Sequence, residues 1–215
     1  IKKNKIYKDL DASLQKKILS IQSIHMFLKL KVAQILDIAL WADSVEESDY
    51  KIINEDVLTI QIIKTHNMNL SYFLGKLSTY LNISSMGIYK LFDNKKFYEI
   101  TFDENVEAQD IAQIEEIIKN SFVTTKKIIL KKPVILRKNI EIECNYTENL
   151  AALKIEAKDQ KGLFAYIAKM FEDFGIDIES AKIYTSKSIA RDLILIEKNG
   201  KFCPNKDEFM DLLSS

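Results

Sequence analysis

The sequence contains few of the residues that most motif-based functions require. Of its 215 residues only five are glycine and two are cysteine. Five glycines supply neither the phosphate-binding loop of P-loop enzymes nor the glycine-rich turn of a dinucleotide-binding fold. The sequence also lacks the Gly-Ser followed by paired Asp of a nucleotidyltransferase and the His-Asp metal pair of a phosphohydrolase. We therefore expect this segment to be catalytically inert on its own.

Cysteine and histidine are too sparse to predict a disulfide framework or a metal site. Cys144 and Cys203 cannot form either by themselves. A reduced, cytoplasmic location fits them best, with Cys144 as a small buried residue of a strand. His25 and His66 have no partner at a useful spacing for a metal ligand, so we expect both to be structural.

Net charge and long apolar runs are also missing. Lys+Arg and Asp+Glu both number 31, so no overall field favours nucleic acid or a membrane surface as a partner. The most apolar early stretch, 18–41, is interrupted by Lys29, Lys31 and Asp37, and no secretory signal is visible.

Because the chain begins at Ile1 rather than at methionine, we expect it to be a piece of a longer protein.

Three regions can be distinguished along the chain. Apolar residues fall at helical spacing from Asp9 to Ala42, which predicts two helices or one long bent helix. The polar stretch 43–49 predicts a linker and a candidate hinge. The domains we expect are a helical segment with its linker at 1–50, a first α+β domain at 51–132 and a second at 133–215.

The two later regions are similar to each other. Residues 153–197 follow the order strand, tight turn, helix, turn, strand, strand, and 57–102 form a weaker copy. Right-handed crossovers would make each copy a ferredoxin-like βαββαβ unit, with helices on one face of an antiparallel sheet. The strands predicted are 57–63, 83–91, 97–102, 128–130 as the closing strand, 140–144, 153–157, 176–184 and 192–197, with helices at 70–81, 106–122, 163–174 and 205–213 and a turn at Asn199-Gly200.

Three short segments of the second copy carry a family pattern. They are the turn Asp159-Gln160-Lys161-Gly162-Leu163, the strand Gly175-Ile176-Asp177-Ile178-Glu179-Ser180-Ala181-Lys182-Ile183, and Arg191-Asp192-Leu193. Together they resemble the ACT domain, and more narrowly the tandem ACT pair at the C-terminus of the bifunctional [protein-PII] uridylyltransferase / uridylyl-removing enzyme. In that family the turn usually runs Asp-Arg-Pro-Gly-Leu, so Gln160 and Lys161 depart from it. The resemblance is good over 140–213 and faint over 55–130.

The resemblance implies a sensor rather than an enzyme. A small-molecule amino acid, glutamine first, would bind between the two ACT domains and bias catalytic nucleotidyltransferase and phosphohydrolase domains upstream. The parent enzyme would use Mg²⁺ and UTP and act on a PII-type signal protein in the cytoplasm, whereas this segment would need no cofactor. Association of copies through the ACT sheets is a further expectation, and neither nucleic acid nor a membrane is expected as a partner.

The turn and the neighbouring strand form the expected ligand site. Gly162 lets the backbone approach a ligand, and the free N–H groups at the start of the helix favour a carboxylate. Asp159 would accept hydrogen bonds from a ligand ammonium. The ligand-binding residues we expect are Asp159, Gln160, Lys161, Gly162, Leu163, Ile178, Glu179, Ser180 and Ala181.

The equivalent loop of the first copy, 65–70, has neither the Asp nor the Gly, so its site is expected to be degenerate. Asn69 is its candidate for a left-handed conformation. We expect Asp177 and Asp192 to be solvent-facing strand or turn residues.

Two other functions are weighed against sensing. The domains could serve only as an interaction or dimerisation module without a ligand, which the altered Gln160-Lys161 turn favours. RNA-recognition motifs share the ferredoxin-like order, but they need exposed aromatic residues on the central strands. The strand 192–196 has none, and the first copy lacks the flanking glycine and basic pattern, so RNA binding is disfavoured.

Overall fold

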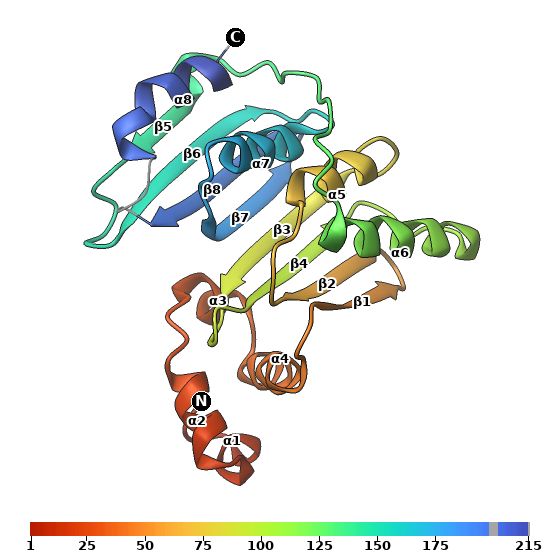
Figure 1. Ribbon diagram of the computed structural model, residues 1–215, viewed down its shortest axis with the longest axis vertical. Coiled ribbons are helices and arrows are strands. Elements are labelled where there is room, and N and C mark those ends of the chain that lie inside the picture. Colours follow the sequence, from red (N-terminus) through yellow and green to blue (C-terminus); the bar gives the residue numbers. More distant parts are fainter. Residues whose placement is uncertain (198–201, 215) are drawn as a thin grey trace.

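The computed structural model describes residues 1–197 and 202–214 (Figure 1). Within those residues it contains eight α-helices and one antiparallel sheet of eight strands, which confirms the predicted α+β class. The predicted turn at Asn199-Gly200 lies outside the described residues. None of the described helices has the length and apolar character that crossing a membrane requires.

The sheet is continuous through the whole α+β region. Its strands lie in the order β1-β2-β4-β3-β7-β8-β6-β5, and every neighbouring pair is antiparallel. The strands are β1 (Asp49–Asn54), β2 (Leu58–Lys64), β3 (Ile83–Lys90), β4 (Lys96–Phe102), β5 (Ile140–Glu143), β6 (Leu150–Lys158), β7 (Ile178–Ser186) and β8 (Ile189–Glu197). β3 and β7 form the seam at which the two halves of the sheet join.

Each half of the sheet belongs to a unit with the element order ββαββα. The first unit contains β1 to β4 with α5 (Leu70–Leu77) and α6 (Ala108–Val123), and the second contains β5 to β8 with α7 (Leu163–Asp173) and α8 (Lys206–Leu213). The predicted order βαββαβ is therefore wrong. The predicted closing strand 128–130 is not a strand, because β1 already occupies the edge beside β2.

The segment that was predicted to close the first unit packs on a helix instead. A Cβ on Gly75 of α5 would lie 2.8 Å from Ile128 Cδ1 and 2.9 Å from Leu130 Cδ2. The absence of a side chain at Gly75 thus lets the connector between the units cross α5 at close range.

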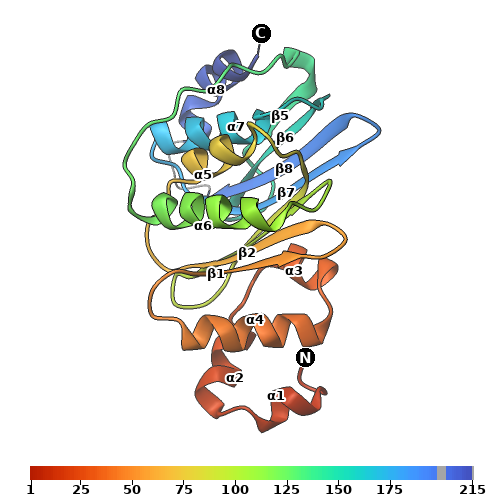
Figure 2. The ribbon, with the colours of Figure 1, turned by 90° about the vertical axis from the view of Figure 1, so that its right-hand side faces the viewer.

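The seam has a local two-fold symmetry. Met86 pairs with Ile183 and Ile88 pairs with Ala181, and each pair becomes the other when the two units are exchanged. α5 and α7 lie side by side over this seam, on the same face of the sheet as α6 (Figures 1 and 2). The main hydrophobic core fills the space between these helices and the sheet.

The N-terminal segment covers the opposite face of the first unit. It consists of four helices, α1 (Lys5–Asp9), α2 (Ala12–Leu19), α3 (Ile24–Lys29) and α4 (Val32–Ser44), rather than the two helices or one long bent helix predicted. Polar capping residues separate them without glycine or proline; the Asp11 carboxylate, for example, accepts a hydrogen bond from Leu14 N at 2.9 Å. A second core joins these helices to Ile63, Tyr89 and Phe97, which alternate with the main-core residues along their strands.

The predicted hinge is bonded to the sheet. Lys95 Nζ donates hydrogen bonds to the carbonyl oxygens of Ala42 (2.6 Å) and Val45 (2.8 Å), and Trp41 Nε1 donates to Asp49 Oδ2 at 2.8 Å. These contacts tie the end of α4 and the linker to the first unit. The linker 45–48 is thus part of the packed structure.

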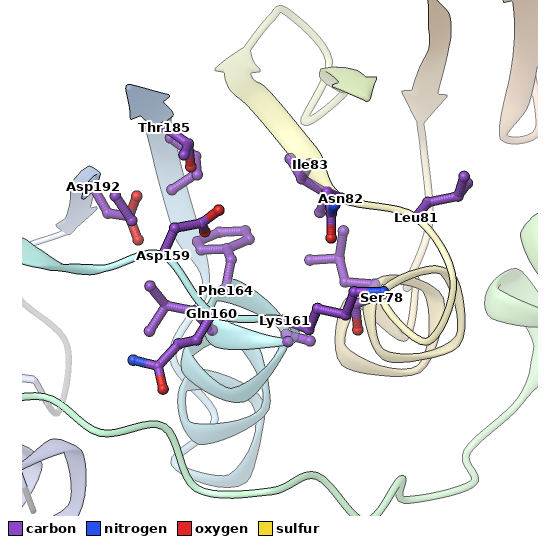
Figure 3. A pocket seen from close by; sticks show the side chains of 16 residues that line it. Ser78, Leu81, Asn82, Ile83, Asp159, Gln160, Lys161, Phe164, Thr185 and Asp192 are labelled. Atoms are coloured by element: carbon purple, nitrogen blue, oxygen red, sulfur yellow. The ribbon is translucent and has the colours of Figure 1, made fainter. Parts of the chain in front are cut away.

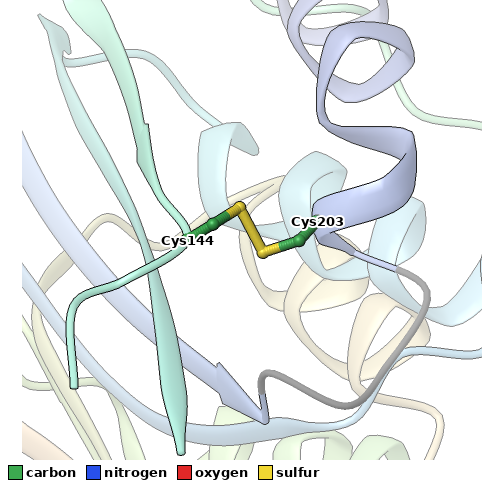
Figure 4. The surroundings of a disulfide bond; sticks show 2 residues. All are labelled: Cys144 and Cys203. Carbon is green, nitrogen blue, oxygen red and sulfur yellow. A yellow bond between two sulfur atoms is a disulfide. The ribbon is translucent and has the colours of Figure 1, made fainter. Parts of the chain in front are cut away.

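The two cysteines form a disulfide, contrary to the prediction of separate reduced thiols (Figure 4). Cys144 follows β5 and Cys203 lies just before α8, with their Cα atoms 5.8 Å apart. Phe209 of α8 also packs on Phe174, with a distance of 4.3 Å between the ring centroids. Because the cysteines are separated by 59 positions in the sequence, their pairing depends on the return of α8 to the sheet.

Candidate functional site

A pocket lies between the two units at one end of the seam (Figure 3). Its volume of about 50 Å³ exceeds the roughly 10–15 Å³ that one water molecule needs. We name it the open pocket. Its lining residues come from the end of α5 and the start of β3 in the first unit, and from the β6–α7 loop, β7 and β8 in the second; they are Leu74, Ser78, Leu81, Asn82, Ile83, Asp159, Gln160, Lys161, Gly162, Leu163, Phe164, Ala165, Ile183, Thr185, Ala190 and Asp192.

The β6–α7 loop is held in place by its own hydrogen bonds. Asp159 N donates to Ser188 O at 2.9 Å, and the Gln160 side chain bonds both the N–H and the C=O of Val134 at 2.9 Å. Gly162 has a φ of +79° at the start of α7, a left-handed conformation that glycine adopts at little cost. All five loop residues predicted from sequence, Asp159 to Leu163, line the open pocket.

Asp192 is the most unusual side chain of the open pocket. It lies on β8 facing the helices, only 4% exposed, and neither of its carboxylate oxygens has a hydrogen-bond partner among the described residues. Burial raises the pKa of Asp192 to about 7, and the nearby carboxylate of Asp159 adds to the shift. The prediction that Asp192 faces solvent is therefore wrong. A buried carboxylate without a partner favours a positively charged or hydrogen-bond-donating ligand.

Other acidic groups share this end of the seam. Burial raises the pKa of Asp103, and the carboxylates of Asp159 and Glu104 add to the shift. Asp103 N donates to Asn82 O at 3.1 Å, which places Asp103 next to the start of β3. Lys161 projects from the loop towards α5 (Figure 3). The open pocket thus combines an acidic interior with a single lysine in its lining.

The wall opposite the loop differs from the one predicted. Ile178 and Ala181 are core residues, Ser180 is buried, and Glu179 forms an ion pair with Lys90 at 2.9 Å; none of the four lines the open pocket. The first residues of β7 lie at the other end of the seam, because β3 and β7 are antiparallel.

The first unit supplies that wall instead. The start of its β3 contributes Asn82 and Ile83. Residues 81–89 of the first copy match 176–184 of the second in sequence, so Asn82 and Ile83 are the counterparts of Asp177 and Ile178. The counterpart of Ile178 thus lines the open pocket, whereas Ile178 itself does not. Asp177 itself is exposed, as predicted, and pairs with Lys96.

The loop 65–69 of the first unit lacks the special conformation of its counterpart. Asn69 has a φ of −78°, so the predicted left-handed conformation is wrong. Its side-chain oxygen instead accepts a hydrogen bond from Tyr72 N at 2.9 Å and caps α5.

Within residues 1–197 and 202–214, no group of three or more His, Cys, Asp or Glu side chains is arranged to hold a metal ion. Comparison with known proteins adds no assignment, since the chain matches no protein-family model and none of the curated proteins.

Proposed function

We propose that this chain is a regulatory module that senses a free amino acid in the open pocket. Glutamine is the first choice, on the resemblance to the tandem ACT region of the uridylyltransferase / uridylyl-removing enzyme. In this proposal the module biases catalytic domains upstream that act on a PII-type signal protein in the cytoplasm.

The observation that carries the proposal is Asp192. Keeping a carboxylate buried without a partner is costly, and such groups occur where a ligand completes the site. A ligand ammonium between Asp192 and Asp159 would supply the missing charge and hydrogen bonds. The side chains of both residues face the same space (Figure 3).

The start of α7 suits the other end of an amino acid. Phe164 and Ala165 of its first turn line the open pocket, and N–H groups at this position have no partner within the helix. The helix N-terminus therefore favours a carboxylate, while Lys161 adds a positive charge nearby. An ammonium and a carboxylate on one small molecule would satisfy both ends of the pocket.

The position of the pocket connects binding to regulation. Residues of both units line it, so a bound amino acid contacts both. A ligand shifts an equilibrium between two arrangements of the units only if it binds one of them better. A ligand that contacts both units would bind better to the arrangement in which both walls reach it.

In the cytoplasm the Cys144–Cys203 pair would not remain a permanent crosslink. That compartment keeps most thiols reduced, so the pair would exchange between dithiol and disulfide.

Thermal unfolding with a panel of amino acids at millimolar concentration tests the proposal. Glutamine at 100 times its dissociation constant should raise the free energy of unfolding by about 2.7 kcal/mol. For a chain of this length this corresponds to a rise of about 5–10 °C in Tm. Two analogues give the matched comparison: 4-carbamoylbutanoate lacks the ammonium group, and 4-aminobutanamide lacks the carboxylate.

We expect neither analogue to reproduce the shift produced by glutamine. If no amino acid changes Tm, the sensor proposal fails, and an interaction module without a ligand becomes the better interpretation.

A further inference from the structure

The two-fold symmetry of the seam creates a second position equivalent to the open pocket. It can be located from the strand pairs of the two units. Met86 of β3 pairs with Ile100 of β4 in the first unit, and the aligned residue Ala181 of β7 pairs with Ile194 of β8 in the second. Ile100 of β4 and Ile194 of β8 are therefore equivalent. Residues the same number of positions before them on the two strands are equivalent as well.

The equivalent residues of the first unit are much larger. Tyr98, two residues before Ile100, is the equivalent of Asp192, two residues before Ile194. Lys96, four residues before Ile100, is the equivalent of Ala190, four residues before Ile194. Asp192 and Ala190 both line the open pocket. We name the position that contains Lys96 and Tyr98 the closed site, because both residues are only 4% exposed.

Lys96 places its ammonium group between two groups of the second unit. Its Nζ donates to Asp177 Oδ2 at 2.7 Å and to the carbonyl oxygen of Ile178. Asp177 and Ile178 are the counterparts of Asn82 and Ile83, which form the first-unit wall of the open pocket. The ammonium thus lies at the start of β7, the position that corresponds to the start of β3 at the open pocket.

A carboxylate of the second unit occupies the helix start at the closed site. Ser71 N, in the first turn of α5, donates to Glu172 Oε1 at 3.1 Å. At the open pocket the end of α5 presents Ser78 to the start of α7; its Oγ lies 3.6 Å from the position of a Cβ on Gly162. The start of α7 at the open pocket is thus faced by the Ser78 hydroxyl, whereas the start of α5 at the closed site is faced by the Glu172 carboxylate.

Tyr98 completes the packing of the closed site. Burial raises the pKa of Tyr98, and the nearby carboxylates of Asp177 and Glu172 add to the shift. The two carboxylates thus lie near the Tyr98 ring, and one of them, Asp177, accepts the hydrogen bond from Lys96. The protein thus supplies both charges of the closed site: the Lys96 ammonium, and the carboxylates of Asp177 and Glu172. Lys64 lies beside them, and burial lowers its pKa, with Lys96 adding to that shift and the two carboxylates opposing it.

We propose that the closed site is a binding site for a primary ammonium group, and that the chain fills it permanently with Lys96. Lys96 acts as a built-in ligand that fixes one end of the seam, so the pair of units offers one site to free ligands rather than two. Only the statement about the open pocket rests on the proposed function. The occupancy of the closed site by Lys96 is independent of it.

Chemical rescue tests this inference without any amino acid. Lys96→Ala leaves Asp177 and the Ile178 carbonyl without their ammonium, and it should lower Tm by about 5–10 °C. n-Propylammonium chloride at 100 mM, about the size of the deleted stem and head, should restore at least half of that loss. Tetramethylammonium chloride and n-propanol at the same concentration should not, because the first has no N–H donor and the second has no charge.

Lys127→Ala is the matched control, since Lys127 also forms an ion pair with the second unit, at 2.8 Å from Asp173, but is 80% exposed. We expect a change of less than about 2 °C and no response to propylammonium. An equal response of both variants, or a folded Lys96→Ala protein that propylammonium does not stabilise, would overturn the proposal.

If Lys96→Ala does not fold, the burial of the Lys96 ammonium can be tested on the unaltered chain. Native protein is treated briefly with acetic anhydride, and labelled lysines are located by peptide mass analysis. Lys96 should be labelled at least tenfold more slowly than Lys127. Equal labelling of the two would contradict a buried, bound ammonium.

Discussion

Asp192 and Tyr98 occupy equivalent positions in the two units, yet one is a carboxylate without a partner and the other is a packed aromatic ring. The same place in the fold is thus an acidic pocket at one end of the seam and filled core at the other. The difference follows from a few side chains, because the strand pairings around both positions match.

Replacement of the buried carboxylate should stabilise the protein at alkaline pH. The native pKa of Asp192, about 7, lies above its ordinary value of 3.8, so the native state holds the proton between these values. The unaltered protein therefore loses stability as pH rises from about 4 to 7, with no further loss above 7. Asp192→Asn should remove this slope and be about 2–4 kcal/mol more stable at pH 8. Urea unfolding at pH 4, 6 and 8 measures it.

Asp56→Asn is the control for that comparison, since Asp56 is exposed in the turn between β1 and β2. It should leave the pH profile unchanged. If the free energy of unfolding changes equally with pH in Asp192→Asn and in the unaltered protein, the pKa of Asp192 is not raised by burial. Asp192→Asn should also abolish the response to glutamine.

Ligand binding should release a proton below neutral pH. An ammonium beside Asp192 favours the charged carboxylate, so binding at pH 6 should release about one proton, and binding at pH 8 almost none. Calorimetric titrations with glutamine in buffers of different ionisation enthalpy measure this number. Binding without proton release at pH 6 would place the ammonium elsewhere in the open pocket.

Gly162 and Gly175 form a matched pair for separating stability from binding. Both have a positive φ, +79° and +65°, and a Cβ at either would meet no atom closer than 3.6 Å. Gly162→Ala and Gly175→Ala should therefore each cost about 1–2 kcal/mol from backbone strain alone. Only Gly162 lines the open pocket, so only Gly162→Ala should weaken glutamine binding by calorimetry. Equal affinities in the two variants would argue against a ligand at the loop.

Reduction of the disulfide should loosen α8 without affecting the seam. Opening a loop of 59 positions removes about 2–4 kcal/mol of stabilisation, measured by urea unfolding with and without dithiothreitol. The double variant Cys144→Ser/Cys203→Ser should be less stable by a similar amount and insensitive to the reductant. The number of glutamine molecules bound per chain should remain one in all of these states.

The sequence patterns predict most of the sheet and its helices because their apolar spacing is regular. β1 escaped prediction because it is an edge strand whose side chains are mostly exposed, so Asp49–Asn54 shows little hydrophobic alternation. Four helices replace two at the N-terminus because polar residues such as Asp11 and Ser20 cap short turns. The pairing of Cys144 with Cys203 has no signal in their spacing.

The candidate site was half predictable. The loop 159–162 has a recognisable turn pattern, but its opposite wall depends on how β3 pairs with β7, which no local pattern specifies. Asp192 did carry a signal, since it shares the alternation of Ile194 and Ile196, both core residues. A period of two therefore places its carboxylate on the buried face.

The antiparallel seam has a mechanical consequence. The open pocket lies where β3 begins and β7 ends. Lys96 forms its hydrogen bond with Asp177 at the opposite end of the β3–β7 pairing. A ligand in the open pocket would therefore contact both units at one end of the seam, while Lys96 holds them together at the other end. If the two units move relative to each other, we expect the end of the seam at the open pocket to move more than the end that Lys96 ties to Asp177.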